Sequence, residues 1–305
     1  MNQKTITIEK TAEKAATNQK TMTKPATLAV SRDSRSEDTI ITIKGNTVGG
    51  DLPIIIGGPC AIESESQMLS AAQALKGMGV SFLRGGAFKP RTSPYSFQGL
   101  GQEGILILER VGRATGMVTV TEVMEPEQVV FVAEHADILQ IGSRNMQNFA
   151  LLKKVGEVSN PILLKRGFSS TIDEFMHAAE YVAAHGNPNI ILCERGIRTF
   201  ETRTRNTLDI SAIPLLKQLT HLPVIGDPSH ASGIKSLIGP LSKAILAVGG
   251  DGIMVECHPD PSVALSDADQ QLNIPEMSAL VDDLRPLITL SADLSSHPME
   301  VARSA

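Results

Sequence analysis

The sequence predicts a (β/α)₈ barrel, and three observations support that fold class. From Asp51 onward, short apolar or β-branched runs alternate with longer segments of helical period, and eight such pairs fit into about 240 residues, the usual size of this barrel. No glycine-rich dinucleotide fingerprint follows the first strand, which disfavours the competing doubly wound open sheet. Ionisable residues follow every predicted strand, whereas the strand interiors are nearly free of charge, as expected if function is concentrated at the C-terminal face.

The predicted elements account for residues 51–290, which we assign to one barrel domain. The strands are expected at Pro53–Gly58, Ser81–Arg84, Met117–Thr121, Ile138–Ile141, Ile162–Leu164, Ile190–Cys193, Pro223–Gly226 and Gly252–Val255. The helices are expected at Ser66–Met78, Glu103–Thr115, Pro126–His135, Gln147–Val155, Ile172–His185, Ile213–Leu219, Ile234–Val248 and Pro275–Leu287.

Three further segments flank the predicted barrel. Residues 1–38 are rich in Thr, Lys, Ala, Ser and Glu, contain no aromatic residue, and are expected to form a flexible arm. Residues 39–50 alternate in polarity and turn at Gly45-Asn46, which predicts a small β-hairpin able to plug the lower end of the barrel. Residues 291–305 are assigned to a C-terminal tail.

The composition disfavours several classes of partner. A net charge of −5 disfavours nucleic acid, because that role usually needs a basic surface. No apolar run approaches the roughly 20 residues that a bilayer-spanning helix needs, so no membrane partner is expected. Three cysteines are too few and too odd in number for a disulfide scaffold, which indicates a reducing, cytoplasmic setting. Small metabolites are the expected partners.

A basic loop after the second predicted strand has the composition of an anion site. The stretch FLRGGAFKPRTSPYSF, from residue 82, places three cations and two hydroxyls within ten residues: Arg84, Lys89, Arg91, Thr92 and Ser93. Arginine offers a planar fork and lysine a mobile point charge, and both suit phosphate and carboxylate. A solvated basic turn is the alternative interpretation. We favour the anion site because similar polar groups follow the other strands.

The remaining strand ends add to this pattern. They carry the residues Cys60, Glu63, Glu122, Arg144, Asn145, Lys165, Arg166, Glu194, Arg195, Arg198, Asp227, His230, Glu256 and His258. Polar strand ends alone would be unremarkable, since loops are polar. A concentration of arginine and lysine at one end of an acidic protein indicates instead a site for more than one phosphate or carboxylate.

A second group at the strand ends has the chemistry of a metal site. Cys60, His230, Glu256 and an aspartate in the loop after the eighth strand could meet around one divalent ion, and this donor set suits Mn, Fe, Co or Zn better than Mg or Ca. From spacing alone, a buried apolar cysteine and a structural loop histidine remain alternatives. If Glu256 points into the barrel mouth, strand alternation turns Cys257 away, and Cys193 is expected in the core.

Eight segments of the chain resemble those of one enzyme family, the 3-deoxy-D-arabino-heptulosonate 7-phosphate (DAHP) synthases. The segments are GGPCAIES, LRGGAFKPRTSPYSFQGLG, VTEVM, IGSRNMQNF, LLKRG, CERGIRTFETRTRNTLD, DPSHASG and VECHPDPSVALSDADQQL. They resemble most closely the short type Iβ form without a regulatory domain, over residues 37–287. The resemblance implies a (β/α)₈ barrel enzyme, active as a homo-oligomer, for which we expect a tetramer. With about 50 residues before the barrel, we expect no built-in feedback inhibition.

The resemblance also implies the reaction and the roles of individual residues. Such an enzyme condenses phosphoenolpyruvate with erythrose 4-phosphate and water to give DAHP and phosphate, which opens the shikimate pathway to the aromatic amino acids. The implied metal ligands are Cys60, His230, Glu256 and Asp267. The implied phosphoenolpyruvate site comprises Arg84, Lys89, Arg144, Lys165, Arg195 and Glu122. The phosphate of erythrose 4-phosphate would bind Arg91, Thr92 and Ser93, and the catalytic residues would be Lys89, as a proton carrier, Cys60 and His230.

Three other functions are compatible with parts of this pattern. The nearest is 3-deoxy-D-manno-octulosonate 8-phosphate synthase, which uses arabinose 5-phosphate and resembles KANRS where this chain has KPRTS from Lys89. A metal-dependent aldolase on the same fold would leave half of the cations unexplained. A non-catalytic barrel that binds a regulatory protein would be expected to lose a metal ligand or the KPRT segment, and this chain retains both.

Overall fold

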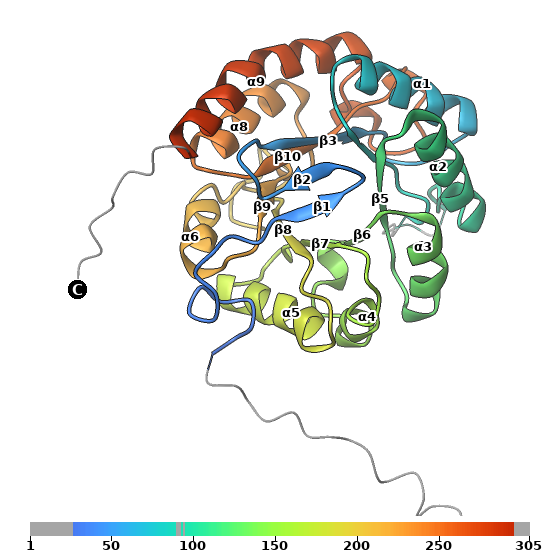
Figure 1. Ribbon diagram of the computed structural model, residues 1–305. Coiled ribbons are helices and arrows are strands. Elements are labelled where there is room, and N and C mark those ends of the chain that lie inside the picture. Colours follow the sequence, from blue (N-terminus) through green and yellow to red (C-terminus); the bar gives the residue numbers. More distant parts are fainter. Residues whose placement is uncertain (1–26, 90–92, 94, 296–305) are drawn as a thin grey trace, which may run out of the picture.

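Eight parallel strands close into a single barrel in the computed structural model, which describes residues 27–89, 93 and 95–295 (Figure 1). Each strand pairs with the next one along the chain, and the last strand pairs with the first. The strands are β3 (Ile54–Gly58), β4 (Phe82–Arg84), β5 (Val118–Glu122), β6 (Ile138–Ile141), β7 (Ile162–Lys165), β8 (Ile190–Glu194), β9 (Val224–Gly226) and β10 (Gly252–Glu256). The predicted (β/α)₈ fold is therefore confirmed.

Helices cover the outside of the barrel, as Figure 1 shows. They are α1 (Glu65–Gly77), α2 (Gln102–Thr115), α3 (Val129–His135), α4 (Phe149–Val155), α5 (Ile172–Ala184), α6 (Ala212–Leu219), α7 (Pro228–Ser232), α8 (Lys235–Ala247) and α9 (Ile274–Ser295). The short α7, directly after β9, has no counterpart in the sequence prediction. Short 3₁₀ turns occur at Pro126–Gln128, Ser143–Asn145, Pro261–Val263 and Ala268–Gln270. Among the described residues, no helix is long and apolar enough to cross a membrane.

The last helix is longer than predicted. Helix α9 runs to Ser295 and so enters the segment 291–305 that we assigned to a tail. The predicted end at Leu287 lies next to Pro286, which the helix contains in its interior. No glycine occurs between that proline and Ser295, and packing of the preceding turns through Leu280 and Leu284 anchors the helix on the core.

A hairpin closes the N-terminal end of the barrel. Strands β1 (Ile41–Ile43) and β2 (Asn46–Val48) pair in antiparallel fashion, and the turn lies at Lys44-Gly45, one position earlier than predicted. Both turn residues have positive φ, 49° and 78°, which is the geometry of a two-residue hairpin turn. The side chains of Ile41 and Val48 are buried in the same cluster as the inward-facing residues of the barrel strands. The hairpin therefore fills the barrel opening, as predicted (Figure 1).

The segment before the hairpin is more ordered than its composition indicates. Residues 1–26 of the predicted flexible arm lie outside the described residues, but the part from Leu28 onward packs against the barrel. The Val30 side chain is buried, its N–H donates to Glu180 Oε2 at 3.1 Å, and Arg32 N donates to Leu219 O at 2.9 Å. Because these groups find partners on α5 and at the end of α6, the prediction of a flexible arm is wrong for this part.

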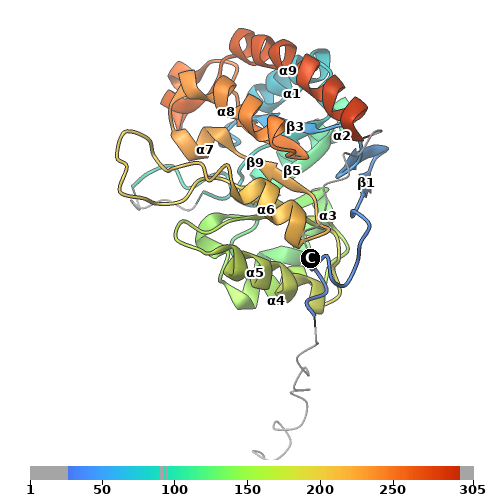
Figure 2. The same ribbon diagram turned by 90° about the vertical axis from the view of Figure 1, so that its left-hand side faces the viewer.

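The core has two layers, one inside the barrel and one between strands and helices. Cys193 lies in the inner layer and Cys257 in the outer one, as the alternation of side chains predicted. The last residues of five strands are charged: Arg84, Glu122, Lys165, Glu194 and Glu256. Figure 2 shows β1 at one end of the barrel and the long loops that follow β4 and β8 at the other. The site is built at that second end.

Candidate active site

Four side chains from distant parts of the chain converge at the C-terminal mouth of the barrel. Cys60 follows β3, His230 lies on α7, Glu256 ends β10, and Asp267 precedes the last 3₁₀ turn. One donor atom from each lies within 4.8 Å of the others. Cys60 and Glu256 are buried, while His230 and Asp267 are partly exposed toward the cavity. The structure thus brings together the four residues that the sequence analysis grouped.

The separations within this cluster suit a single ion. Cys60 Sγ lies 3.5 Å from Asp267 Oδ2, His230 Nε2 lies 3.2 Å from Glu256 Oε1, and His230 Nε2 lies 4.0 Å from Asp267 Oδ2. Bond lengths of a tetrahedral zinc site imply ligand separations of about 3.3–3.7 Å. A thiol, an imidazole and two carboxylates also form the mixed donor set that borderline divalent ions prefer. The residues present therefore fit a divalent metal ion.

Helix α7 fixes the orientation of His230. Asp227 caps this helix, with Oδ1 accepting from His230 N at 2.9 Å, and Pro228 occupies the first helical position. The other carboxylate oxygen, Oδ2, lies 2.7 Å from His230 Nδ1, so Nε2 is turned toward Glu256. A carboxylate that holds one ring nitrogen while the other faces a metal is the usual outer-shell arrangement. The DPSH segment thus contains a helix cap that also orients the His230 side chain.

Lys89 lies against the Cys60 ligand. Its Nζ donates to Cys60 O at 2.9 Å and to Cys60 Sγ at 3.0 Å. Gly86 makes this approach feasible, because a Cβ there would lie 2.9 Å from Lys89 Cδ and 2.8 Å from Cys60 O. Burial, and then the negative charge of Glu256, raise the pKa of the Cys60 thiol to about 11, although Lys89 acts in the opposite direction. A bound cation is what such a thiol needs to ionise near neutral pH.

Glu256 is ionised at the centre of the cluster. Its Oε1 accepts from Arg84 Nη1 at 2.6 Å, and its Oε2 accepts from Gln270 Nε2 at 2.5 Å. Burial alone would raise the pKa of this carboxyl group, but His230 and Arg84 lower it far below its usual range. The buried charge is therefore compensated on two sides, as buried charges generally are.

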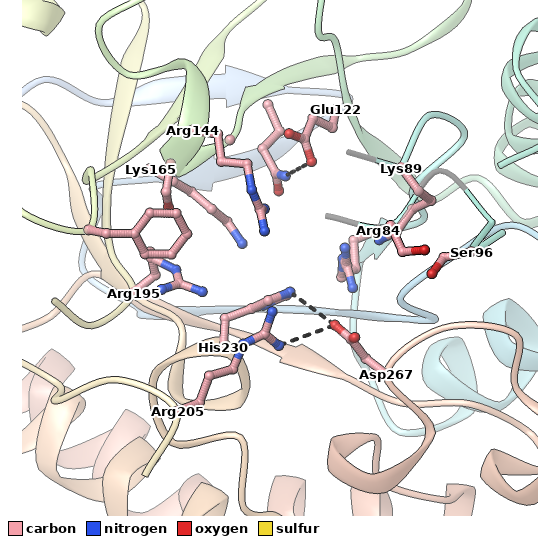
Figure 3. Close-up of a pocket in the computed structure, with 15 residues that line it drawn as sticks. Arg84, Lys89, Ser96, Glu122, Arg144, Lys165, Arg195, Arg205, His230 and Asp267 are labelled. Carbon is pink, nitrogen blue, oxygen red and sulfur yellow. Dashed lines mark hydrogen bonds and ion pairs between the residues drawn. The ribbon is translucent and has the colours of Figure 1, made fainter. Parts of the chain in front are cut away.

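Asp267 has an unusual backbone and its own outer partners. Its φ of 50° is in the left-handed region, which aspartate enters more readily than most residues. Gln270 Nε2 lies 3.4 Å from Asp267 Oδ2, and Arg205 Nη1 lies 3.3 Å from the same oxygen. Figure 3 shows Arg205 and His230 both directed at this carboxylate. Asp260 and Asp269, two other aspartates of the same loop, are not members of the four-residue cluster.

A cationic cavity opens beside this cluster. It has a volume of about 330 Å³, and five of its lining cations were predicted from the sequence: Arg84, Lys89, Arg144, Lys165 and Arg195. Figure 3 shows these side chains around the same space as His230 and Asp267. Ser93 and Glu122 also line the cavity, whereas the predicted Arg91 and Thr92 lie outside the described residues. The arrangement can hold a small polyanion next to a divalent cation.

The cavity cations differ in their partners. Lys165 Nζ donates to Asp227 Oδ2 at 2.5 Å, so one buried carboxylate serves both Lys165 and His230. Burial alone would raise the pKa of Asp227, but His230 and Lys165 lower it well below its ordinary value. Arg144 and Arg195 lie instead over the ring of Phe168, with their Cζ atoms 5.5 Å and 4.7 Å from its centroid.

Several sequence-level candidates lie outside the cavity lining. Arg166 is buried in ion pairs with Glu194 at 2.9 Å and Asp209 at 2.8 Å, which is a structural role. Arg198 is exposed, although its Cζ lies 5.1 Å from the Phe168 centroid. Glu63 accepts from Leu265 N at 2.8 Å and so ties two loops together.

Sequence reasoning missed several residues of the site, including Arg205, Gln140, Phe168 and Gln270. Arg205, Gln140 and Phe168 line the cavity, and Gln270 donates to both Glu256 and Asp267. Arg205 and Phe168 lie in loops, where no periodicity indicates direction. Gln140 lies within β6, opposite Glu122 in the strand register, so the alternation of side chains could have identified it.

Comparisons with known proteins show which family this chain resembles. A family model described as the DAHP synthetase I family matches residues 33–288. A phospho-2-dehydro-3-deoxyheptonate aldolase of Thermotoga maritima is 51% identical over 258 residues, which span 85% of this chain and 76% of that protein. A 2-dehydro-3-deoxyphosphooctonate aldolase of Magnetococcus marinus is 34% identical over 267 residues, 81% of this chain and 92% of that one.

Solved structures show the same similarity. The crystal structure of a Thermotoga maritima phospho-2-dehydro-3-deoxyheptonate aldolase (DAHP synthase) matches with a TM-score of 0.84 and 50% identity, covering 86% of this chain and 77% of that one. A truncated form of 3-deoxy-D-arabino-heptulosonate 7-phosphate synthase from the same organism matches with a TM-score of 0.81 and 48% identity, covering 86% and 97%.

Proposed function

The chain belongs to the DAHP synthetase I family, and we propose that its barrel mouth performs that family's reaction through the residues assigned below. The reaction is the condensation of phosphoenolpyruvate with erythrose 4-phosphate and water to give DAHP and phosphate, the first step of the shikimate pathway. The observation that carries the residue assignment is the convergence of a four-residue donor cluster and a cationic cavity at one end of the barrel.

Cys60, His230, Glu256 and Asp267 are assigned as ligands of a divalent ion, Mn, Fe, Co or Zn. The mixed donor set and the three separations described above, 3.2, 3.5 and 4.0 Å, support the assignment. A divalent ion bound there would act as a Lewis acid on the aldehyde oxygen of erythrose 4-phosphate. Asp227 and Gln270 keep His230, Glu256 and Asp267 in place through the hydrogen bonds described above.

The cavity cations are assigned to phosphoenolpyruvate, which carries a phosphate and a carboxylate. The residues are Arg84, Lys89, Arg144, Lys165 and Arg195, with Glu122 lining the same space. Their role is to hold two multiply charged substrates that would otherwise repel each other, so that much of the rate enhancement comes from positioning and charge neutralisation. The phosphate of erythrose 4-phosphate is assigned to Arg91, Thr92 and Ser93, of which Ser93 lines the cavity.

Lys89 is assigned as the proton carrier. It is buried, it contacts both the sulfur and the carbonyl oxygen of Cys60, and it lines the cavity that the substrates would share. A lysine in that place can deliver a proton to the reacting carbon as the ammonium, or accept one from it as the neutral amine. With Cys60 and His230 acting through the metal, these three residues form the proposed catalytic group.

Arabinose 5-phosphate is the alternative second substrate, that of 3-deoxy-D-manno-octulosonate 8-phosphate synthase. Two relatives named 2-dehydro-3-deoxyphosphooctonate aldolase are 34% and 31% identical to this chain, against 51% for the relative named for the heptulosonate product. The KPRTS segment from Lys89 also favours the four-carbon aldose. The preference for erythrose 4-phosphate therefore rests on similarity and on this loop together.

Two broader properties complete the proposal. We assign the enzyme to the cytoplasm, which the three free, buried cysteines support because they are compatible with a reducing compartment. We also propose a homotetramer, on the grounds of family resemblance alone.

One assay tests the function. Phosphate release from phosphoenolpyruvate is measured with erythrose 4-phosphate or arabinose 5-phosphate, before and after removal of divalent ions by a chelator. We expect release with erythrose 4-phosphate only, loss of activity on chelation, and recovery when Mn²⁺ is added back. Equal rates with both sugars, or full activity after exhaustive chelation, would contradict the proposal.

A further inference from the structure

A single aromatic ring at the barrel mouth lies beside three guanidinium groups. The Cζ atoms of Arg195, Arg198 and Arg144 lie 4.7, 5.1 and 5.5 Å from the centroid of the Phe168 ring. All three distances are within the range of cation–π attraction, about 6 Å. Phe168 lines the cavity together with Arg144 and Arg195, whereas Arg198 is exposed outside it. Positive charges from the segments after β6 and β8 thus lie against one aromatic ring.

Arg144 and Arg195 differ from other cations of the cavity in how their charge is balanced. Arg84, Lys165 and Arg205 each form an ion pair, with Glu256, Asp227 and Asp267 respectively. Within the part of the chain that the structure describes, neither Arg144 nor Arg195 forms an ion pair with a carboxylate. The hydrogen bond of the Arg195 guanidinium goes to a backbone carbonyl, Gly196 O, at 3.4 Å. The ring of Phe168 is the feature that these two guanidiniums share.

This difference has a chemical reason in an anion site. A carboxylate would balance the arginine charge, but it would also compete with an incoming phosphate for the N–H donors. A ring face attracts the cation through its quadrupole and leaves those donors free. Arg195 needs such support, because burial lowers the pKa of its guanidinium. An aromatic partner therefore stabilises the charge without blocking the site.

The loop backbone holds the ring in place independently of the cavity arginines. Arg166, two positions earlier, is fixed by its ion pairs with Glu194 and Asp209. Phe168 O accepts a hydrogen bond from Arg198 N at 2.7 Å. At Gly167 a Cβ would lie 2.3 Å from Ser170 Oγ, so the loop is packed tightly just before the ring. The ring can thus act as a fixed support.

We propose that Phe168 is a positioning residue for anion binding, which holds Arg144 and Arg195 with their N–H groups available to the phosphate of phosphoenolpyruvate. The inference rests on the proposed function, in which these two arginines bind that substrate. Phe168 acts through the arginines, by the face of its ring, and not through contact with the reacting atoms.

The test compares Phe168→Leu, which keeps an apolar side chain without a ring, with Phe168→Tyr, which restores the ring. Phe200→Leu is the matched control, because that phenylalanine is 98% exposed on the loop after β8. The dissociation constants of phosphoenolpyruvate and of inorganic phosphate are measured by calorimetry on the full-length protein with the same divalent ion throughout. Steady-state constants for both substrates are measured in parallel.

We expect Phe168→Leu to raise the dissociation constants of both anions by about five- to thirty-fold, because two cation–π contacts are lost. The KM for phosphoenolpyruvate should rise in parallel, with kcat within about threefold of wild type and the KM for erythrose 4-phosphate unchanged. Phe168→Tyr should bind within about twofold of wild type, as should Phe200→Leu. If Phe168→Leu does not fold, Phe168→Met takes its place.

Three results would overturn the inference. The first is unchanged affinity for both anions in Phe168→Leu. The second is a Phe168→Tyr variant that binds both anions as weakly as Phe168→Leu does. The shape of the phenylalanine side chain, and not the face of its ring, would then account for the lost affinity. The third is weaker phosphoenolpyruvate binding with unchanged phosphate binding, which would mean that the ring contacts the substrate directly. Failure of the proposed function is distinguishable, because the wild-type protein would then not bind phosphoenolpyruvate.

Discussion

Replacing Asp227 with asparagine removes a negative charge that is shared by His230, a proposed metal ligand, and Lys165, a proposed substrate-binding cation. Asp227 is fully buried, and its Oδ2 lies 2.7 Å from His230 Nδ1 and 2.5 Å from Lys165 Nζ. Because those neighbours lower its pKa well below the ordinary value, the carboxylate is charged at any working pH. Asparagine preserves the shape and one acceptor, but it cannot balance Lys165 or increase the basicity of the imidazole.

Loss of an outer-shell partner of this kind typically weakens metal binding by 10- to 100-fold, which corresponds to about 1.4–2.7 kcal/mol. The affinity for Mn²⁺ is measured by competition with a chromogenic chelator, for wild type and for Asp227→Asn at one pH and ionic strength. We expect the variant to fall in that range and to bind phosphoenolpyruvate more weakly as well, because Lys165 loses its orienting partner.

Asp251→Asn is the matched control for this substitution. Asp251 is a partly buried aspartate that is also paired with a lysine, Lys217 Nζ at 2.9 Å, but it lies just before β10, at the opposite end of the barrel from the site. The Asp251→Asn substitution should lower the thermal stability of the protein and leave its metal affinity unchanged. Metal affinity of Asp227→Asn within twofold of wild type, or an equal loss in both variants, would refute the idea that Asp227 orients His230.

Three further predictions concern turnover, metal dependence and pH. Lys89→Ala should lower kcat by at least about a hundredfold, and a variant that keeps most of the wild-type kcat would remove Lys89 from the catalytic group. Cys60→Ala should fold but show no metal-dependent activity, so an active metal-free variant would disprove the ligand assignment. Burial alone would raise the pKa of the Glu276 carboxyl group. Hydrogen bonds from Asn273 N at 2.8 Å and from Lys235 Nζ at 3.0 Å outweigh it and lower that pKa. The stability gained from its charge is therefore present above an unfolded pKa of about 4.3 and lost as the pH falls through the lower folded value. The difference in Tm between wild type and Glu276→Gln should accordingly shrink between pH 7 and pH 3, and a pH-independent difference would contradict this.

The barrel and three of the four residues of the donor cluster could be predicted because strand physics is local. Alternation along β10 places Glu256 in the mouth and Cys257 in the outer layer, and the structure confirms both positions. The charged last residues of β4, β5 and β7 likewise follow from the rule that parallel strands of a barrel present their C-terminal ends to one face.

The remaining features depend on long-range contacts that a local pattern does not encode. Composition could not distinguish Asp267 from Asp260 or Asp269, because the choice depends on a loop in which Asp267 adopts positive φ. Phe168 acquires its surroundings only when the segments after β6 and β8 meet over it. Val30 lies in a segment whose composition indicates disorder, yet it docks into an apolar site between distant elements.

X-ray absorption spectroscopy of the metal-loaded protein tests the central claim most directly. With one equivalent of zinc or cobalt, the account predicts one sulfur scatterer at about 2.3 Å together with nitrogen and oxygen ligands at about 2.0–2.2 Å, and loss of the sulfur signal in Cys60→Ala. A wild-type spectrum with oxygen and nitrogen ligands alone would contradict it, because the ion would then not be bound by the cluster of Cys60, His230, Glu256 and Asp267.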